Sequence, residues 1–310
     1  NIEKSNRPLS DYFNSKHDYL KYLLKSNFSE LITVDELSEI RNQIINQGTE
    51  YSPKFVDNLK KLSKIISLNY SEELKLYLNL IQSTYGTKDA AFVGLKEVWS
   101  IEMAFPILNL LGNNAKILVV LRDPLDIVAS SFSGVSNYSI LSLVRQWRKQ
   151  LVFYSYLKKN YPNSIELLNY EDFCSNPLVT LTTNLQKLDL VSKIFSSSSI
   201  KPIDDYGNSW IKNSSYLNKE NSQNIDKKSI GKYKKILDKS EIEWIIYLTH
   251  MCSYKKYNHN NAPPGKPKSS FPKKNINNVA EWAKFDILSL EGDNLDLQLN
   301  LEEDRIRKMS

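Results

Sequence analysis

The chain has 310 residues, 41% of them hydrophobic, and a formal net charge of +6. This length suffices for one large core, and no run approaches the roughly 18 consecutive apolar residues that a membrane-spanning helix requires. The basic residues are scattered among asparagines and serines and form no stripe, which argues against a nucleic-acid partner.

The N-terminal region is predicted to be helical. Its amphipathic patterns cover residues 19–24, 34–47, 53–68 and 71–84, the last with Ser71 as its cap. A short strand is then predicted over Phe92–Lys96, followed by a helix over Ile101–Leu111 that ends at Gly112. We expect the early helices to cover a sheet and to frame a cleft.

A strand that stops on an arginine is the most informative local pattern. Residues 117–121 form an aliphatic run too short for a typical helix, which predicts a parallel strand covered on both faces. Arg122 ends the strand, and Asp123 then suits a helix N-cap, with a proline next and Asp126 placed to reach back towards the cap. Ligands of open α/β sheets bind outside the strands' carboxyl ends, so a guanidinium beside a helix N-terminus predicts a phosphate site there. Ser130 adds a hydroxyl two turns into the helix.

The rest of the chain continues the alternation of helix and strand. The predicted elements are a helix over 140–159, a strand over 165–169, a helical region over 225–237 and a helix over 241–252. This order is typical of an α/β protein with a doubly wound parallel sheet and flanking helices. After an irregular stretch rich in asparagine, lysine and proline, residues 295–301 alternate like an edge strand.

These segments resemble the sulfotransferases that use 3′-phosphoadenosine 5′-phosphosulfate (PAPS). In that family an arginine at a strand end and a serine eight positions later hold the 3′-phosphate, and Arg122 and Ser130 have this spacing. Leu167–Leu178, with Tyr-Glu-Asp near its start, is similar to the family's next strand, turn and helix. The resemblance covers about residues 92–237 and implies the P-loop-like sulfotransferase fold. The alternative is an arginine that forms a structural ion pair with Asp126 or Glu171.

The resemblance extends to Ser229, Gly231 and Lys232. In bacterial and carbohydrate-type sulfotransferases, a late Ser-x-Gly-basic-aromatic stretch closes over the nucleotide and returns a basic residue to the 3′-phosphate. The resemblance therefore implies cofactor binding by these three residues. The alternative is that the lysines of this stretch form only the solvated face of a helix.

Lys96 matches the position at which the family has a lysine facing the transferring sulfuryl group, and Glu97 adjoins it, where some members use a glutamate as the base. A cation there stabilises charge that develops on the leaving phosphate in the transition state. Val98 occupies the position of the histidine base of many members, so the resemblance leaves Glu97 or an upstream residue as the general base. The alternative for Lys96 is a solvated lysine at a strand end.

The family's opening strand and Gly/Ser/Thr-rich loop, which cradles the 5′-phosphosulfate, have no counterpart in this sequence. No two of the nine glycines lie within seven residues of each other. We therefore expect an N-terminally incomplete sulfotransferase domain, its P-loop strand missing, over residues 1–253, an irregular linker over 254–278 and a C-terminal extension over 279–310.

The resemblance implies an enzyme that moves a sulfuryl group from PAPS to a hydroxyl or amine of an acceptor, with a saccharide preferred. No metal is expected, since a cationic pocket can neutralise the donor and the cysteines and histidines lack metal-ligand spacing. A cytoplasmic location is expected if the source is bacterial. The alternative is a non-catalytic 3′-phosphonucleotide-binding or interaction module that has lost the loop. A P-loop kinase-like protein is disfavoured because no Gly-x-x-x-x-Gly-Lys is present.

Overall fold

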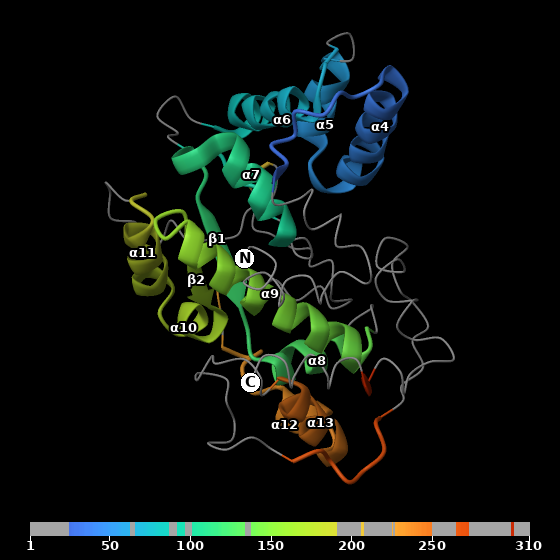
Figure 1. Ribbon diagram of the computed structural model, residues 1–310, viewed down its shortest axis with the longest axis vertical. Coiled ribbons are helices and arrows are strands. Elements are labelled where there is room, and N and C mark those ends of the chain that lie inside the picture. Colours follow the sequence, from blue (N-terminus) through green and yellow to red (C-terminus); the bar gives the residue numbers. More distant parts are fainter. Residues whose placement is uncertain are drawn as a thin grey trace. The chain divides into compact units, whose positions relative to one another are not determined.

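The computed structural model of the chain describes residues 25–62, 66–86, 92–96, 101–133, 138–190, 206–207, 225, 227–249, 265–272 and 299–300. The chain divides into two compact units (Figure 1). The helical unit comprises residues 21–115 and 202–210, and the α/β unit comprises residues 1–20, 116–201 and 211–310. The domain bounds expected from the sequence, with one domain over residues 1–253, stay a prediction.

Three longer helices lie in the described part of the helical unit: α4 (Val34–Tyr51), α5 (Pro53–Lys61) and α6 (Tyr70–Tyr85). They are followed by η1 (Ile101–Met103), α7 (Ala104–Leu111) and η2 (Gly112–Asn114). Helix α4 begins with a capping box, in which Thr33 and Glu36 satisfy each other's backbone N–H groups. Helix α6 begins earlier than predicted, because the side chain of Asn69 rather than Ser71 caps it by accepting the N–H of Glu72.

Two predictions for the helical unit are wrong. Helix α5 ends at Lys61, well before the predicted residue 68, and Asn69 forms an isolated antiparallel bridge with Leu31. Phe92–Lys96 has no regular secondary structure. A strand needs a hydrogen-bonding neighbour, and the described residues supply none for this segment; Phe92 and Leu95 are 56% and 59% exposed. The expected helix over 19–24 lies outside the described residues.

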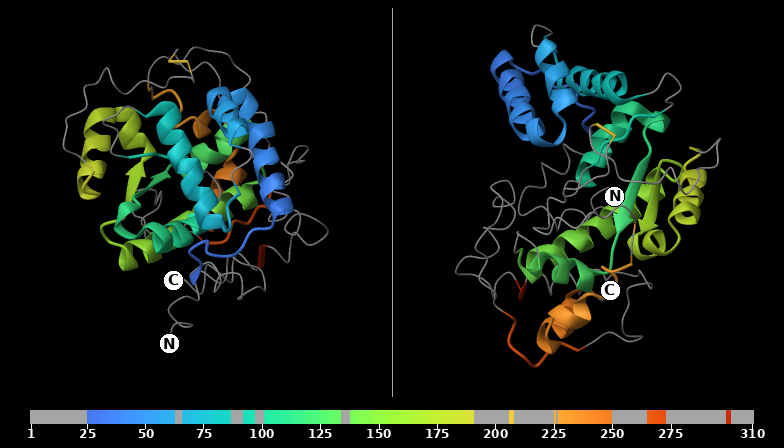
Figure 2. Two further views of the ribbon diagram at one scale, coloured as in Figure 1. Left: turned by 90° about the horizontal axis from the view of Figure 1, so that it is seen from above. Right: turned by 180° about the vertical axis from the view of Figure 1, so that it is seen from behind.

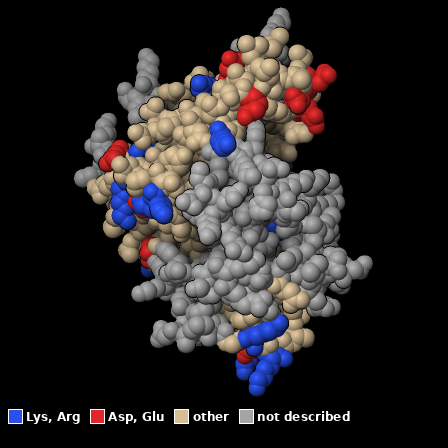
Figure 3. Space-filling view, in the orientation of Figure 1, with Lys and Arg blue, Asp and Glu red and all other residues tan. Residues whose placement is uncertain are grey.

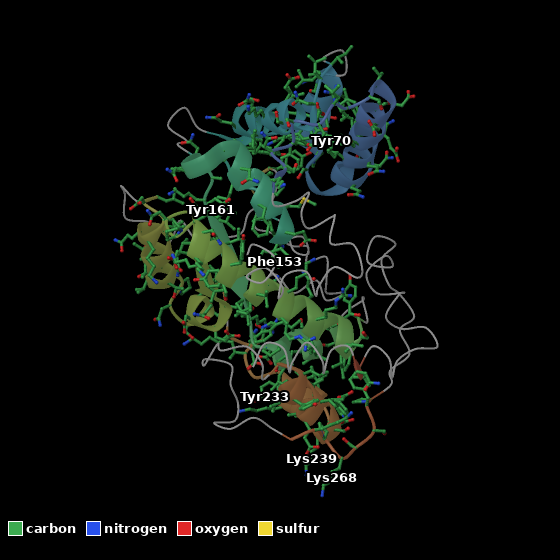
Figure 4. All side chains as sticks on the ribbon, viewed as in Figure 1. Tyr70, Phe153, Tyr161, Tyr233, Lys239 and Lys268 are labelled. Atoms are coloured by element: carbon green, nitrogen blue, oxygen red, sulfur yellow. The ribbon has the colours of Figure 1, made fainter. Side chains whose placement is uncertain are left out.

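Among its described residues, the α/β unit has two parallel strands, β1 (Ile117–Leu121) and β2 (Ile165–Asn169). Both strands have the predicted bounds. Between them in the chain lie α8 (Pro124–Phe132) and α9 (Ile140–Asn160), and α9 packs against both strands. Phe153 of α9, labelled in Figure 4, is fully buried. This is an α/β arrangement.

The expectation that β1 is covered on both faces holds for only one of them. Successive side chains of a strand point to opposite faces. Val119 and Leu121 are buried, whereas Val120, which points the other way, is 51% exposed. The part of the chain that the structure describes therefore covers β1 chiefly on the face that carries Val119 and Leu121.

Further helices in the described part of the α/β unit are α10 (Tyr170–Ser175), α11 (Pro177–Lys187), α12 (Tyr233–Ile236) and α13 (Lys239–Thr249). Helices α12 and α13 both pack against α8, as Figure 1 and Figure 2 show. Residues 265–272 are irregular and lie on α13, where Trp244 donates a hydrogen bond to the carbonyl of Ser269. Residues 299–300 are helical, which contradicts the edge strand predicted there. No helix among the described residues is both long and apolar enough to cross a membrane.

Candidate functional site

The residues that follow the carboxyl ends of the two parallel strands contact each other through a hydrogen bond and a cation–π interaction. Leu121 lies opposite Asn169 in the sheet, so the next residues, Arg122 and Tyr170, leave it at the same edge. The guanidinium carbon of Arg122 lies 4.8 Å from the centroid of the Tyr170 ring. The carboxylate of Glu171 accepts the backbone N–H of Asp123 at 2.8 Å. The strand end that carries Arg122 is therefore held by side chains from the neighbouring strand end.

Helix α8 starts at this edge as predicted. Asp123 is the N-cap, and its carboxylate accepts the N–H of Leu125 at 2.8 Å. Trp147 of α9 donates its indole N–H to the carbonyl oxygen of Arg122 at 2.9 Å, which satisfies the last strand carbonyl before the helix. The carbonyl of Arg122 and the N–H of the next residue, Asp123, therefore both have side-chain hydrogen-bond partners.

Asp126 does not reach back to the cap, so the prediction of a reciprocal cap is wrong. Its side chain is 1% exposed and accepts two backbone N–H groups from far along the chain, those of Gly231 at 2.7 Å and Tyr233 at 3.0 Å. The reciprocal cap favours glutamate or glutamine, and the aspartate side chain is one methylene shorter. The carboxylate is instead available to another segment.

That segment, residues 227–233, is called here the late segment. It runs through turns before α12 begins at Tyr233. The carbonyl of Ser229 accepts a hydrogen bond from Arg122 Nη2 at 2.8 Å, and its hydroxyl pairs with the hydroxyl of Tyr170 at 2.7 Å. Gly231 has φ +74°, a conformation that favours glycine. The late segment is therefore anchored on both strand ends.

Lys232 ties the late segment to the far part of α8, since its ammonium group donates to the hydroxyl of Ser133 at 2.9 Å. Asp126, Ser130 and Ser133 are spaced as i, i+4 and i+7, so they lie on one face of the helix and its end. The late segment contacts the first and the last of the three, which places Ser130 on the face that the segment follows. Four of the residues assigned to cofactor binding by resemblance, namely Arg122, Ser229, Gly231 and Lys232, are thus joined by contacts, and Ser130 lies on the helix face between two of the contact points.

The other two residues assigned by resemblance are Lys96 and Glu97. Lys96 is exposed in the irregular segment 92–96 of the helical unit, and Glu97 lies outside the described residues. Their assignment to the reacting groups stays a prediction.

The charges around Arg122 do not form the structural ion pair that was the alternative for this residue. Within the described residues, Arg122 pairs with neither Asp126 nor Glu171, because both carboxylates accept backbone N–H groups instead. The Nε atom of Arg122 is buried and has no hydrogen-bond partner in the same part of the chain. A buried cationic donor without an acceptor is costly, so this position favours an added anion.

Burial also affects the tyrosines of the site. Burial raises the pKa of the Tyr170 hydroxyl above its usual value, and the hydrogen bond with Ser229 opposes that rise. Burial likewise raises the pKa of Tyr233, with the carboxylates of Asp123 and Asp126 acting in the same direction. Both hydroxyls therefore remain protonated at neutral pH and can donate hydrogen bonds.

The lysines near α12 divide into two kinds. Figure 3 shows basic side chains gathered over α12 and α13, and Lys234 and Lys235 are exposed there, as expected of a solvated helix face. Lys232 differs, because it is partly buried and bonded to α8. The alternative of a purely solvated charge run describes the first two lysines but not the third.

Sequence reasoning missed Asp126 and Tyr170 as members of the site. Tyr170 was within reach of prediction, since neighbouring parallel strands that end together bring the residues after them to one edge. Asp126 gave no such signal, because its partners lie 105 and 107 residues away. Comparison of the chain with protein-family models, with curated proteins and with solved structures gave no match.

Proposed function

We propose that this protein is a PAPS-dependent sulfotransferase whose 3′-phosphate site lies between the end of β1, helix α8 and the late segment. The observation that carries the proposal is the attachment of the late segment to α8 and to Arg122, through Asp126, Ser133 and the carbonyl of Ser229. One of these contacts joins Arg122 and Ser229, which lie 107 residues apart and were assigned to one nucleotide on sequence resemblance alone. The other two attach the assigned residues Gly231 and Lys232 to Asp126 and Ser133 of the α8 region. The doubly wound, P-loop-like sulfotransferase fold is part of the same proposal.

The residues present suit a 3′-phosphate. Arg122 offers a planar guanidinium with a buried Nε that lacks an acceptor, which favours charge-assisted contact with phosphate oxygens. Ser130 supplies a hydroxyl from the same helix face, and Lys232 supplies a second cation from the late segment. The carboxylates of Glu171 and Asp126 accept backbone N–H groups, and neither forms an ion pair with the guanidinium in the described part of the chain.

In the proposed reaction, the bond between the sulfuryl sulfur and the bridging oxygen of the donor phosphate breaks. A bond from sulfur to the acceptor oxygen or nitrogen forms, and adenosine 3′,5′-bisphosphate leaves. We assign charge stabilisation on the leaving phosphate to Lys96 and acceptance of the acceptor's proton to Glu97. The acceptor class we propose is a hydroxyl or amine compound, with a saccharide preferred.

Calorimetric titration of the protein with adenosine 3′,5′-bisphosphate and with AMP tests the proposal. The two ligands share the adenosine and the 5′-phosphate and differ only at the 3′-phosphate. We expect the bisphosphate to bind at least about tenfold more tightly, which corresponds to about 1.4 kcal/mol. Equal affinities, or no binding of either nucleotide at millimolar concentration, would contradict the proposal.

A further inference from the structure

We infer that Asp126 is a positioning residue that preorganises the late segment for nucleotide binding. The inference rests on the proposed function for its ligand, but its geometry stands independently. Asp126 is 1% exposed, and each of its carboxylate oxygens accepts one backbone N–H of the late segment, Gly231 at 2.7 Å and Tyr233 at 3.0 Å. Two charge-assisted hydrogen bonds in a buried place hold a segment firmly.

The segment needs this support because it has little structure of its own. Helix α12 has only 4 residues, and its N-cap Lys232 makes no capping hydrogen bond with its side chain. So short a helix is not stable alone, and the N–H groups at its start need acceptors. Asp126 supplies the acceptor from another helix, which makes α12 dependent on α8.

The other anchors of the late segment involve groups that the proposed function gives to the ligand. Arg122 holds the carbonyl of Ser229, and Lys232 holds the hydroxyl of Ser133, but both cations are assigned to the 3′-phosphate. The bonds to Asp126 use the backbone N–H groups of Gly231 and Tyr233 and involve neither of these two cations. These bonds can therefore persist with and without nucleotide. The conformational entropy of the segment is then lost on folding and does not weaken nucleotide binding.

Asp126→Asn is the most specific test of these two hydrogen bonds. The asparagine has nearly the same shape, but it carries no charge, and its amide NH₂ must face one of the two N–H donors. We expect amide exchange of the late segment and α12 to increase about tenfold or more while β1 and β2 stay protected. Adenosine 3′,5′-bisphosphate should bind about tenfold more weakly, and AMP should change by less than about twofold.

Asp189→Asn is the matched control. Asp189 is exposed and has φ +57°, a conformation that asparagine tolerates, so the same charge is removed away from the late segment. This variant should match the wild type in amide exchange and in binding of both nucleotides.

Hydrogen exchange of the ligand-free wild type tests the geometry without any substitution. The amides of Gly231 and Tyr233 should exchange at least about a hundredfold more slowly than in an unstructured peptide. Exchange at the unstructured rate would overturn the inference, as would an Asp126→Asn protein that keeps wild-type exchange and affinity. If the wild type shows the protection but binds no bisphosphate, the proposed function fails while the anchoring by Asp126 stands.

Discussion

The guanidinium of Arg122 lies over the ring of Tyr170, with its central carbon 4.8 Å from the ring centroid. The hydroxyl of the same tyrosine pairs with the hydroxyl of Ser229 at 2.7 Å. One side chain at the end of β2 thus supports both the cation at the end of β1 and the segment that covers it. Tyr170 therefore connects the ends of β1 and β2 with the late segment.

Substitutions of Tyr170 separate these two contacts. Tyr170→Phe keeps the ring beneath Arg122 but loses the hydroxyl pair, so it should lower the free energy of unfolding by about 0.5–1.5 kcal/mol. Tyr170→Leu loses the ring as well and should cost about 0.5–1 kcal/mol more. Urea unfolding measures both changes. A Leu variant no less stable than the Phe variant would show that the stacking contributes nothing.

Gly231→Ala tests the backbone of the late segment. Gly231 has φ +74° and an added Cβ would meet no atom within 4 Å, so the substitution introduces backbone strain without a clash. That strain is about 1–2 kcal/mol, and we expect a roughly tenfold loss in affinity for adenosine 3′,5′-bisphosphate by calorimetry.

Gly112→Ala is the control for this prediction. Gly112 also has a positive φ, +57°, and open space around an added Cβ, but it belongs to the helical unit. It should lose stability and keep its bisphosphate affinity. Equal losses of affinity in the two variants would mean that Gly231 acts only through global stability.

A buried ion pair in the helical unit predicts a pH dependence of stability. Arg41 donates to both carboxylate oxygens of Glu73, at 2.8 and 2.7 Å, and Ser67 donates at 2.6 Å. Burial by itself would raise the pKa of Glu73, but these hydrogen bonds lower it below its usual value. A depressed carboxylate pKa stabilises the fold above the unfolded pKa, near 4.3, and that stabilisation is lost as the pH falls through the folded pKa.

Glu73→Gln should therefore lower the free energy of unfolding at pH 7 by about 3–5 kcal/mol, because it leaves a buried guanidinium without its carboxylate. Below pH 4, the free energy of unfolding should also fall less in the variant than in the wild type, because the variant lacks the titrating carboxylate. Urea unfolding of both proteins from pH 7 to pH 3 measures this. Parallel stability curves for the two proteins would rule out Glu73 as the titrating group.

Lys96 is tested by kinetics in any form of the protein that transfers a sulfuryl group. If Lys96 stabilises charge on the leaving phosphate, Lys96→Ala should lower kcat by about 10²-fold or more and leave KM nearly unchanged. Lys60→Ala, which removes an exposed lysine of α5, should change neither constant. If Glu97 is the base, Glu97→Gln should also abolish the acidic limb of the pH–rate profile. A slow Glu97→Gln enzyme that keeps the limb would point to another base.

Local patterns sufficed for the two strands of the α/β unit and for the start of α8, but not for the helical region predicted over 225–237, of which the described part is mostly turns. The bounds of β1 and β2 follow from aliphatic runs that stop at polar residues, and the start of α8 follows from Asp123 and the proline after it. Phe92–Lys96 carries a similar pattern but forms no strand, because pairing depends on a neighbour that the local sequence does not specify.

The site was predictable only where its residues follow strand ends or a family spacing. Arg122 and Ser130 could be named from their interval, whereas Asp126 was read as a cap because capping rules consider only the nearest residues. Its partners, Gly231 and Tyr233, reach it through tertiary folding across more than a hundred residues. A carboxylate that binds distant backbone N–H groups leaves no periodic trace in a single sequence.

The proposed function depends most on Arg122 as the ligand of a 3′-phosphate, and Arg122→Ala tests that role. Calorimetry of the wild type and the variant with adenosine 3′,5′-bisphosphate and with AMP isolates the 3′-phosphate contribution. We expect the variant to lose about 2–4 kcal/mol of binding free energy for the bisphosphate and hardly any for AMP, because the lost contact is charge-assisted and specific to the 3′ position. Equal losses for the two nucleotides, or none for either, would contradict the account.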